Sequence, residues 1–85
     1  MKQLLHFYDE EYPLSLSLSS IVNLFLEDHE DVEYVKLSVS DPENTELITK
    51  YSIDSAPTLV AIKDDGTFKT HKEFIIVPEI EALFE

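Results

Sequence analysis

Alternating hydrophobic and polar positions predict four short strands. The first is the apolar and aromatic run "QLLHFY" at 3–8, and the second is "VEYVKLSVS" at 32–40. The third, "TLVAIK" at 58–63, contains a continuous apolar run, which is typical of a central strand covered on both faces. The fourth, "TFKTHKEF" at 67–74, follows a tight turn in which Gly66 supplies a positive φ, and its lysines indicate an edge strand.

The segment from Leu14 to Glu27 fits either a strand or a helix. Leucine and serine alternate in its first half as in a half-buried strand, but apolar residues also recur along it at helical spacing. Length decides between the two, because such a run is far longer than a usual strand and ordinary for a helix. We therefore predict a helix from about 14 to 27, introduced by Pro13, with Leu16 on its exposed face.

Two shorter helices complete the predicted order. Asp41 and Pro42 are typical of an N-cap and a first helical residue, and the short helix that follows them has one apolar stripe. Pro78 is expected to open the last helix. The order β-α-β-α-β-β-α predicts an α/β fold in a single domain over residues 1–85. Its first βαβ unit is parallel, and helices cover both faces of a four-stranded mixed sheet.

Charge and composition argue against several classes of function. A net charge of −12 disfavours binding to nucleic acid and to anionic membrane surfaces, both of which attract basic patches. The chain has no cysteine, and therefore no disulfide, thiolate nucleophile or zinc–cysteine site. No apolar run approaches the length of a membrane span, and the N-terminus becomes acidic too soon for a signal peptide. We expect a cytoplasmic protein that is monomeric when alone.

One segment resembles the thioredoxin family. "KYSIDSAPTLV", from Lys50 to Val60, is similar to the stretch in which thioredoxins carry a cis-proline, and the resemblance extends over residues 3 to 84. It implies a thioredoxin-like fold close in size to the minimal glutaredoxin core. It also implies a cis peptide bond between Ala56 and Pro57, although only about 5–6 % of X–Pro bonds in folded proteins are cis.

The residues at the redox positions of that family differ in this chain. Thioredoxins carry Cys-x-x-Cys after the first strand, whereas this chain places Tyr12 at the position of the attacking cysteine and Ser15 at that of the resolving one. Two hydroxyls cannot form a disulfide, and thiol–disulfide exchange requires a thiolate. The family's buried acid in the first strand is also missing, with His6 near its position. The resemblance therefore implies the fold without the redox activity.

The remaining polar residues indicate neither serine catalysis nor metal binding. A nucleophilic Ser15 would need a positioned base, and we expect none of the histidines at 6, 29 and 71 to serve it. Ser15 is therefore interpreted as a helix N-terminal capping residue. Asp9, Glu10 and Glu11, with Asp54 across the loop, are interpreted as a solvated acidic run. We predict no catalytic residue, no metal site and no cofactor.

The remaining candidate is a binding surface. Thioredoxin-like proteins bind extended chains in a groove beside the first helix and the cis-proline loop, a form of strand addition. Carried over residue by residue, the resemblance places a partner-binding groove at Tyr12, Pro13, Leu14, Ser15, Leu16, Ser55, Ala56 and Pro57. Within it, the aromatic and leucine side chains are expected to form an exposed apolar patch with an acidic rim.

Three functions fit these observations. The first is a redox-inactive module that binds a protein or peptide partner, with the acidity of the chain favouring a basic one. The second is a small-molecule binder or enzyme of the glutathione-using type. It would need basic residues or free N–H groups for carboxylates, and none of the six basic residues lies at 9–16. The third is an accessory subunit of a larger assembly, for example of a phage.

Overall fold

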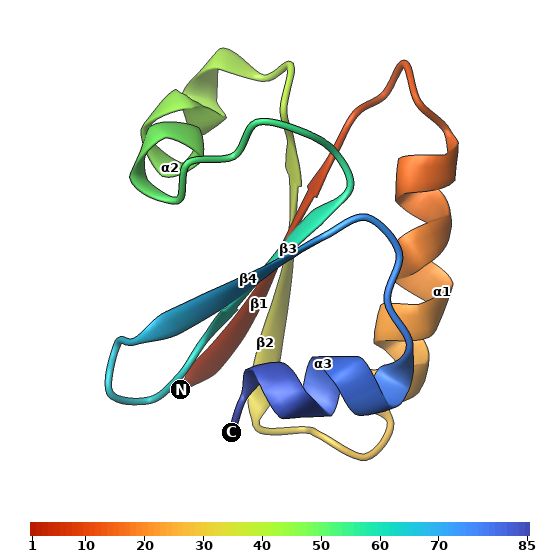
Figure 1. Ribbon diagram of the computed structural model, residues 1–85, viewed down its shortest axis with the longest axis vertical. Helices are drawn as coiled ribbons and strands as arrows, with labels where there is room; N and C mark the ends of the chain where they lie inside the picture. The colour runs from red at the N-terminus through yellow and green to blue at the C-terminus, as the bar shows by residue number, and fades with distance from the viewer.

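One mixed sheet forms the centre of the computed structural model, which describes residues 1–85. Its strands are β1 (Lys2–Tyr8), β2 (Val32–Ser38), β3 (Thr58–Ile62) and β4 (Phe68–Lys72), in the spatial order β2-β1-β3-β4 (Figure 1). β1 pairs with β2 in parallel, whereas β1–β3 and β3–β4 are antiparallel. The predicted mixed sheet and its parallel first unit are confirmed.

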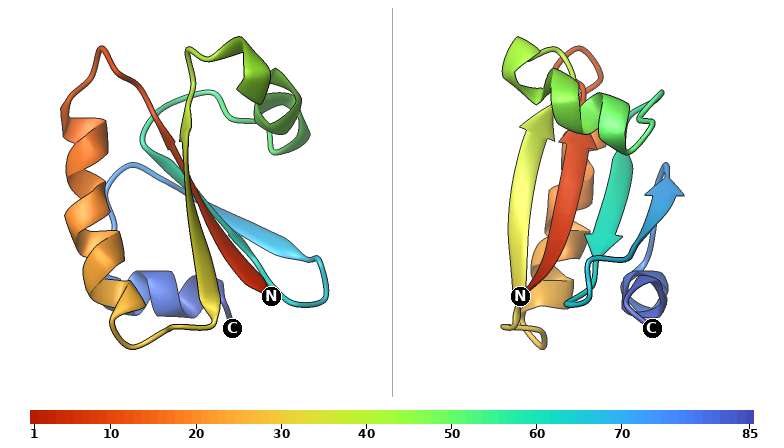
Figure 2. Two further views of the ribbon diagram at one scale, coloured as in Figure 1. Left: turned by 180° about the vertical axis from the view of Figure 1, so that it is seen from behind. Right: turned by 90° about the vertical axis from the view of Figure 1, so that its left-hand side faces the viewer.

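Helices cover both faces of the sheet. The helices are α1 (Leu14–Leu26), α2 (Thr45–Lys50), which follows a short 3₁₀ turn (Pro42–Asn44), and α3 (Val77–Leu83). α1 and α3 lie on one face and α2 on the other, as the two views of Figure 2 show. The predicted α/β class and element order are confirmed. None of the helices has the length and apolar character needed to cross a membrane.

β3 ends one residue earlier than predicted, and two other strands end two residues earlier because the backbone turns. β2 stops at Ser38 rather than at residue 40, since the N–H of Asp41 bonds to the carbonyl of Ser38 and the N–H of Ser40 to its hydroxyl. β4 stops at Lys72 because Glu73 has a left-handed φ of 66° and donates its N–H to the carbonyl of Pro57. Val39 follows the last residue of β2, but its N–H still bonds to the carbonyl of Tyr8, and its side chain packs on the smaller core with Val35 and Leu37.

Local signals in the sequence explain most of the remaining boundaries. The side chain of Asp41 accepts a hydrogen bond from the N–H of Glu43, and therefore caps the 3₁₀ turn as predicted. Gly66 has a φ of 87° in the turn between β3 and β4, which agrees with the predicted role of the glycine. α1 ends at Leu26, with Glu27 as its C-cap, one residue earlier than predicted.

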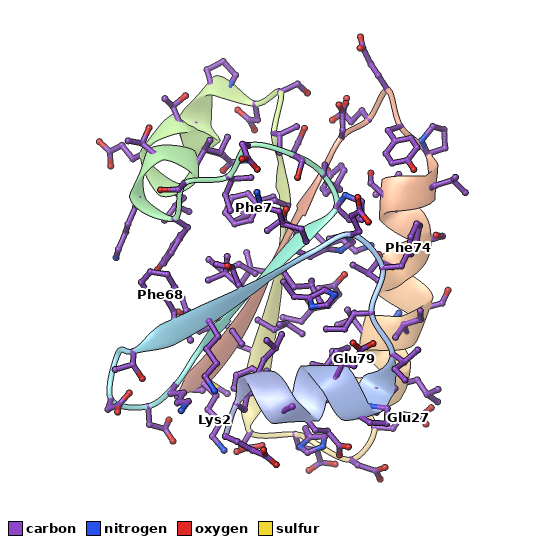
Figure 3. All side chains as sticks on the ribbon, viewed as in Figure 1. Lys2, Phe7, Glu27, Phe68, Phe74 and Glu79 are labelled. Carbon is purple, nitrogen blue, oxygen red and sulfur yellow. The ribbon has the colours of Figure 1, made fainter.

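A hydrophobic core lies on each side of the sheet. The larger core lies between the sheet and the helices α1 and α3, and the smaller one between the sheet and α2. Phe7, on the smaller side, points toward α2 (Figure 3). β1 and β3 contribute to both cores because successive side chains of a strand point to opposite faces. The fully or nearly fully buried members are Leu4, Leu18, Val22, Phe25, Leu59, Ala61, Ile75 and Ile80 on the larger side, and Leu5, Phe7, Tyr51 and Val60 on the smaller side.

Candidate functional site

Ser15 lies on the buried side of the first turn of α1 and ties the preceding loop to the helix. Its hydroxyl accepts the N–H of Asp9 at 3.0 Å, and lies 2.7 Å from the carbonyl of Tyr12 and 3.0 Å from that of Asp9, to either of which it can donate. The side chain is completely buried. The N-cap position of α1 belongs to Pro13, and no side chain caps it. The capping interpretation of Ser15 is therefore wrong, because its oxygen serves the loop and not a free N–H of the helix.

His6 is the second buried polar side chain at this end of α1. Its Nε2 lies 2.8 Å from the carbonyl oxygen of Ser15, and its Nδ1 lies 2.7 Å from the hydroxyl of Tyr34. Since a carbonyl only accepts, Nε2 carries the proton. The hydroxyl of Tyr34 continues the chain of hydrogen bonds to Ser19, at 3.3 Å. This network joins β1, β2 and α1, and no buried polar side-chain atom of the protein lacks a partner.

Burial sets the protonation state of this network. It lowers the pKa of His6 below its ordinary value of 6.5; the hydrogen bond to Ser15 opposes that shift, and the charge of Lys36 adds to it. Burial also raises the pKa of Tyr34 above 10.0. At neutral pH His6 is therefore uncharged, and its Nδ1 accepts a hydrogen bond from the Tyr34 hydroxyl.

This arrangement agrees with the expectation that no histidine serves Ser15 as a base. His6 does reach this residue, but it bonds to the backbone carbonyl rather than to the hydroxyl. The nitrogen that faces Ser15 is protonated, so it cannot take a proton from a serine nucleophile. The contact therefore supports no serine catalysis and serves to hold α1 against β1.

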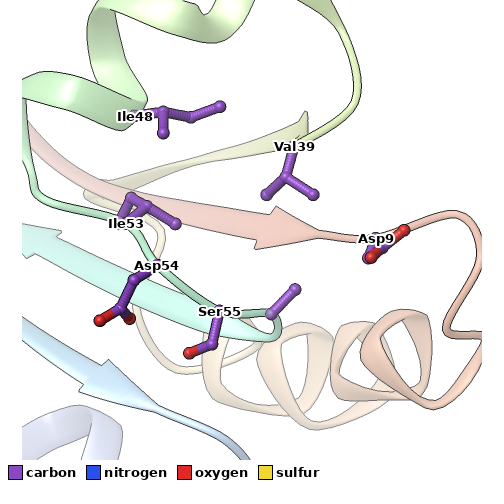
Figure 4. A pocket seen from close by; sticks show the side chains of 7 residues that line it. Asp9, Val39, Ile48, Ile53, Asp54 and Ser55 are labelled. Atoms are coloured by element: carbon purple, nitrogen blue, oxygen red, sulfur yellow. The ribbon is translucent and has the colours of Figure 1, made fainter.

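A cleft of about 250 Å³ opens on the α2 side of the sheet, beside Ala56 (Figure 4). Its polar lining residues are Asp9, Asp54 and Ser55. Its apolar lining residues are Val39, Ile48, Ile53 and Ala56. Most of the lining is therefore aliphatic, and this composition suits an apolar side chain of a ligand.

The two carboxylates at this cleft are engaged with other groups. Asp54 turns toward β4 and forms an ion pair with Lys72 at 2.8 Å, and the hydrogen bond from Lys72 holds the pKa of Asp54 below its usual value. Asp9 accepts the N–H of Glu11 at 2.9 Å. The fold does bring Asp9 and Asp54 to one cleft, but no group of three or more potential ligands is placed to hold a metal ion.

The backbone of Ala56 is unpaired at the edge of this cleft. Neither its N–H nor its carbonyl makes a hydrogen bond within the chain. On either side of it, Ser55 accepts the hydroxyl of Thr58 and Pro57 accepts the N–H of Glu73. The peptide bond between Ala56 and Pro57 is cis, the isomer that the resemblance implies.

The predicted groove residues divide between two surfaces. Ser55 and Ala56 line the cleft, and Pro57 is buried next to them. Pro13 is exposed and Ser15 is buried. The side chains of Tyr12, Leu14 and Leu16 are 42 %, 56 % and 39 % exposed around the first turn of α1, and none of them lines the cleft.

Sequence reasoning missed three lining residues of the cleft. The sequence pattern places Ile48 on the apolar stripe of the short helix, Ile53 in a loop, and Val39 on one face of the strand predicted over 32–40. The structure packs all three against the smaller core, and the cleft opens beside them. The only signal in the sequence is an apolar residue directly after a strand, which is too common to identify a cleft.

Solved structures resemble this fold, although no protein-family model and no curated protein sequence matches the chain. Thioredoxin-2 of the malaria parasite superposes with a TM-score of 0.80 at 18 % identity, over 98 % of this chain and 80 % of that one. The chain has a thioredoxin fold. Thioredoxin from Fasciola hepatica gives 0.77 at 22 % identity, over 96 % and 77 % of the two chains. Desulfothioredoxin from Desulfovibrio vulgaris gives 0.80 at 20 % identity, with the same coverage of 96 % and 77 %.

These similarities show the thioredoxin fold and nothing about function, since every identity is low. The predicted combination of a thioredoxin fold with no Cys-x-x-Cys motif is confirmed, because the chain contains no cysteine. Of the two residues that the resemblance places at the cysteine positions, Tyr12 is exposed and Ser15 is bonded to the backbone.

Proposed function

We propose that this protein is a redox-inactive module that binds an extended segment of a partner protein at the cleft beside Ala56. The observation that supports this function is that an aliphatic cleft lies beside Ala56, whose backbone N–H and carbonyl make no hydrogen bond within the chain. An extended chain can bond to such a backbone pair while one of its apolar side chains enters the cleft. The exposed ring of Tyr12 offers a further contact of a type enriched in binding hot spots.

The partner segment carries positive charge outside its apolar anchor. Asp9, Glu10 and Glu11 form the loop that borders the cleft, and no basic residue lines it. Complementary charge speeds association and selects among partners more than it adds affinity. The same acidity disfavours glutathione, whose carboxylates would meet Asp9 rather than a cationic side chain.

Quantitative affinity capture from the source cell tests this function. The wild-type chain and two variants, Tyr12→Ala and Ala56→Glu, serve as baits, and captured proteins are compared by mass spectrometry. Ala56→Glu places a long charged side chain in the cleft, so the specific partner should be lost from this bait and reduced with Tyr12→Ala. Thr49→Asp, on the exposed surface of α2, is the control and should capture the partner normally.

Two outcomes would count against the proposal. If every enriched protein binds the Ala56→Glu bait as well as the wild type, the cleft is not the binding site. If titration of the labelled chain with glutathione shifts amide signals at 53–56 in NMR spectra, the small-molecule function takes its place. Circular dichroism of each variant confirms that the fold is intact.

A further inference from the structure

The outward face of α1 has an unusual composition for an exposed helix. Its sequence, "LSLSLSSIVNLFL", contains no charged residue, although 28 % of the whole chain is charged. One side of the helix packs Leu18, Val22 and Phe25 into the larger core. The opposite side of a surface helix normally carries charged and polar residues. Here it carries leucine, serine and asparagine.

Leu16, Ser20 and Leu24 form a continuous stripe along this outward face. They are spaced four residues apart, and residues at that spacing lie one above the other on a helix. The two leucines are 39 % and 58 % exposed, and the serine between them is also exposed. A small residue between two large ones leaves a hollow that accepts a side chain of a second helix. α1 lies at the outer margin of the molecule, and no other element covers this side (Figure 1).

Acidic residues bracket the uncharged helix at both ends. Asp9, Glu10 and Glu11 precede α1, and no lysine or arginine occurs from Gln3 to Val35. The acidic residues that follow α1 are Glu27, Asp28, Glu30 and Asp31, of which Asp31 is paired with Lys2. Negative charge is unfavourable at the C-terminus of a helix, and no basic residue in the last turn of α1 offsets it. Cations supplied from outside would remove this unfavourable interaction.

This charge pattern selects among the possible occupants of the stripe. A second copy of the chain would bring acidic ends against acidic ends whether the two helices ran parallel or antiparallel, and like charges repel. An anionic lipid surface would be repelled for the same reason. A helix with an apolar stripe and basic ends meets neither obstacle.

We propose that the outward face of α1 is a second docking surface, which takes an amphipathic helix of a partner protein. That helix presents an apolar stripe to Leu16, Ser20 and Leu24, and carries lysine or arginine at both ends. Because α1 has 13 residues, the two basic clusters lie about 20 Å apart. None of the three stripe residues lines the cleft beside Ala56, so the stripe is a separate surface from that cleft, although Leu16 belongs to the groove predicted from the resemblance.

The test uses the full chain and a synthetic peptide. The peptide is helical, with a leucine stripe and lysines at both ends, and NMR spectra of the isotope-labelled chain report where it binds. Saturable shifts are expected at the amides of residues 16, 20 and 24. Leu16→Glu and Leu24→Glu should each weaken binding by at least about tenfold, whereas Thr49→Glu on α2 should leave it unchanged.

Charge exchange provides the second arm of the test. The double variant Glu27→Lys and Asp28→Lys should weaken binding of the lysine-ended peptide and allow a glutamate-ended peptide to bind. Both substitutions are on exposed residues, and circular dichroism confirms that the variant is folded. A lysine-ended peptide whose stripe leucines are replaced by serine should not bind the wild type.

Four results would overturn the proposal. They are the absence of shifts at about 1 mM peptide, shifts centred on residues 53–56, equal binding of the lysine-ended and glutamate-ended peptides by the wild type, and a dimer in sedimentation experiments that Leu24→Glu dissociates. The last of these would assign the stripe to a second copy of the chain.

Discussion

Ser15, which the resemblance places at a cysteine position, uses its hydroxyl for backbone hydrogen bonds. The oxygen accepts the N–H of Asp9 inside the protein, and the proton goes to a carbonyl of the same loop. The residue therefore stabilises the entry into α1, and the geometry gives it no role in chemistry.

Replacing Ser15 by alanine should destabilise the protein. Ser15→Ala leaves the N–H of Asp9 without its partner, and an unsatisfied buried group costs about 1–3 kcal/mol of unfolding free energy. Ser17→Ala is the matched control, because this exposed hydroxyl bonds only to the carbonyl of Leu14 and its loss should change stability by less than about 0.5 kcal/mol. Urea denaturation measures both, and equal losses would contradict the assigned role.

His6 should make the protein less stable in mild acid. Since burial lowers its folded-state pKa, the unfolded chain takes up a proton near 6.5 that the folded chain does not. The unfolding free energy therefore falls as the pH drops through 6.5 toward the folded-state pKa, and it is fully retained above 6.5. Urea midpoints from about pH 8 to pH 5 should show this loss.

The variant His6→Gln isolates this contribution. Glutamine can still donate to the carbonyl of Ser15, but it does not titrate. The unfolding free energy should therefore depend less on pH between about pH 8 and pH 5. His29 and His71 remain in the variant and act as internal controls. An unchanged slope would show that His6 does not cause the loss.

The start of α2 and the end of α1 show how the helix dipole interacts with acidic residues in this chain. Glu46 lies in the first turn of α2, where the helix dipole favours negative charge, whereas Asp28 follows the end of α1, where it does not. α1 tolerates this arrangement because its buried stripe packs into the larger core.

Neutralising Asp28 and neutralising Glu46 should change the unfolding free energy in opposite directions. Asp28→Asn should raise the unfolding free energy by about 0.3–1 kcal/mol, and Glu46→Gln should lower it within the same range. Thermal unfolding at low ionic strength measures the difference, which should shrink in about 1 M salt because the charges are screened. A common sign for both variants would mean that overall repulsion outweighs the local helix dipoles.

At the scale of the whole molecule, the two proposed binding surfaces lie on opposite faces of the sheet. The cleft beside Ala56 includes Ile48 of α2, whereas the stripe of Leu16, Ser20 and Leu24 belongs to α1 on the other side (Figure 2). The cleft and the stripe have no residue in common. The net charge of −12 favours basic partners at both proposed surfaces.

Much of the fold could be predicted because the signals are local. The apolar run of β3 predicted a central strand, and the lysines of β4 predicted an edge strand, as the structure shows. Helical periodicity predicted that Leu16 is exposed, and it is. The lining of the cleft was harder to predict from the sequence. Val39, Ile48 and Ile53 belong to separate segments, and the pattern within each segment does not predict that they line one cleft.

The sequence by itself determined the order of the elements, the absence of thiol chemistry and the net acidity of the chain. These properties follow from periodicity and composition, which each segment carries without reference to the others. Only the tertiary structure decided that Ser15 binds a loop, that His6 faces its carbonyl, and that Val39, Ile48 and Ile53 form a cleft beside Ala56. Such contacts join residues of different elements and loops, and periodicity along one element does not report which parts of the others will meet it.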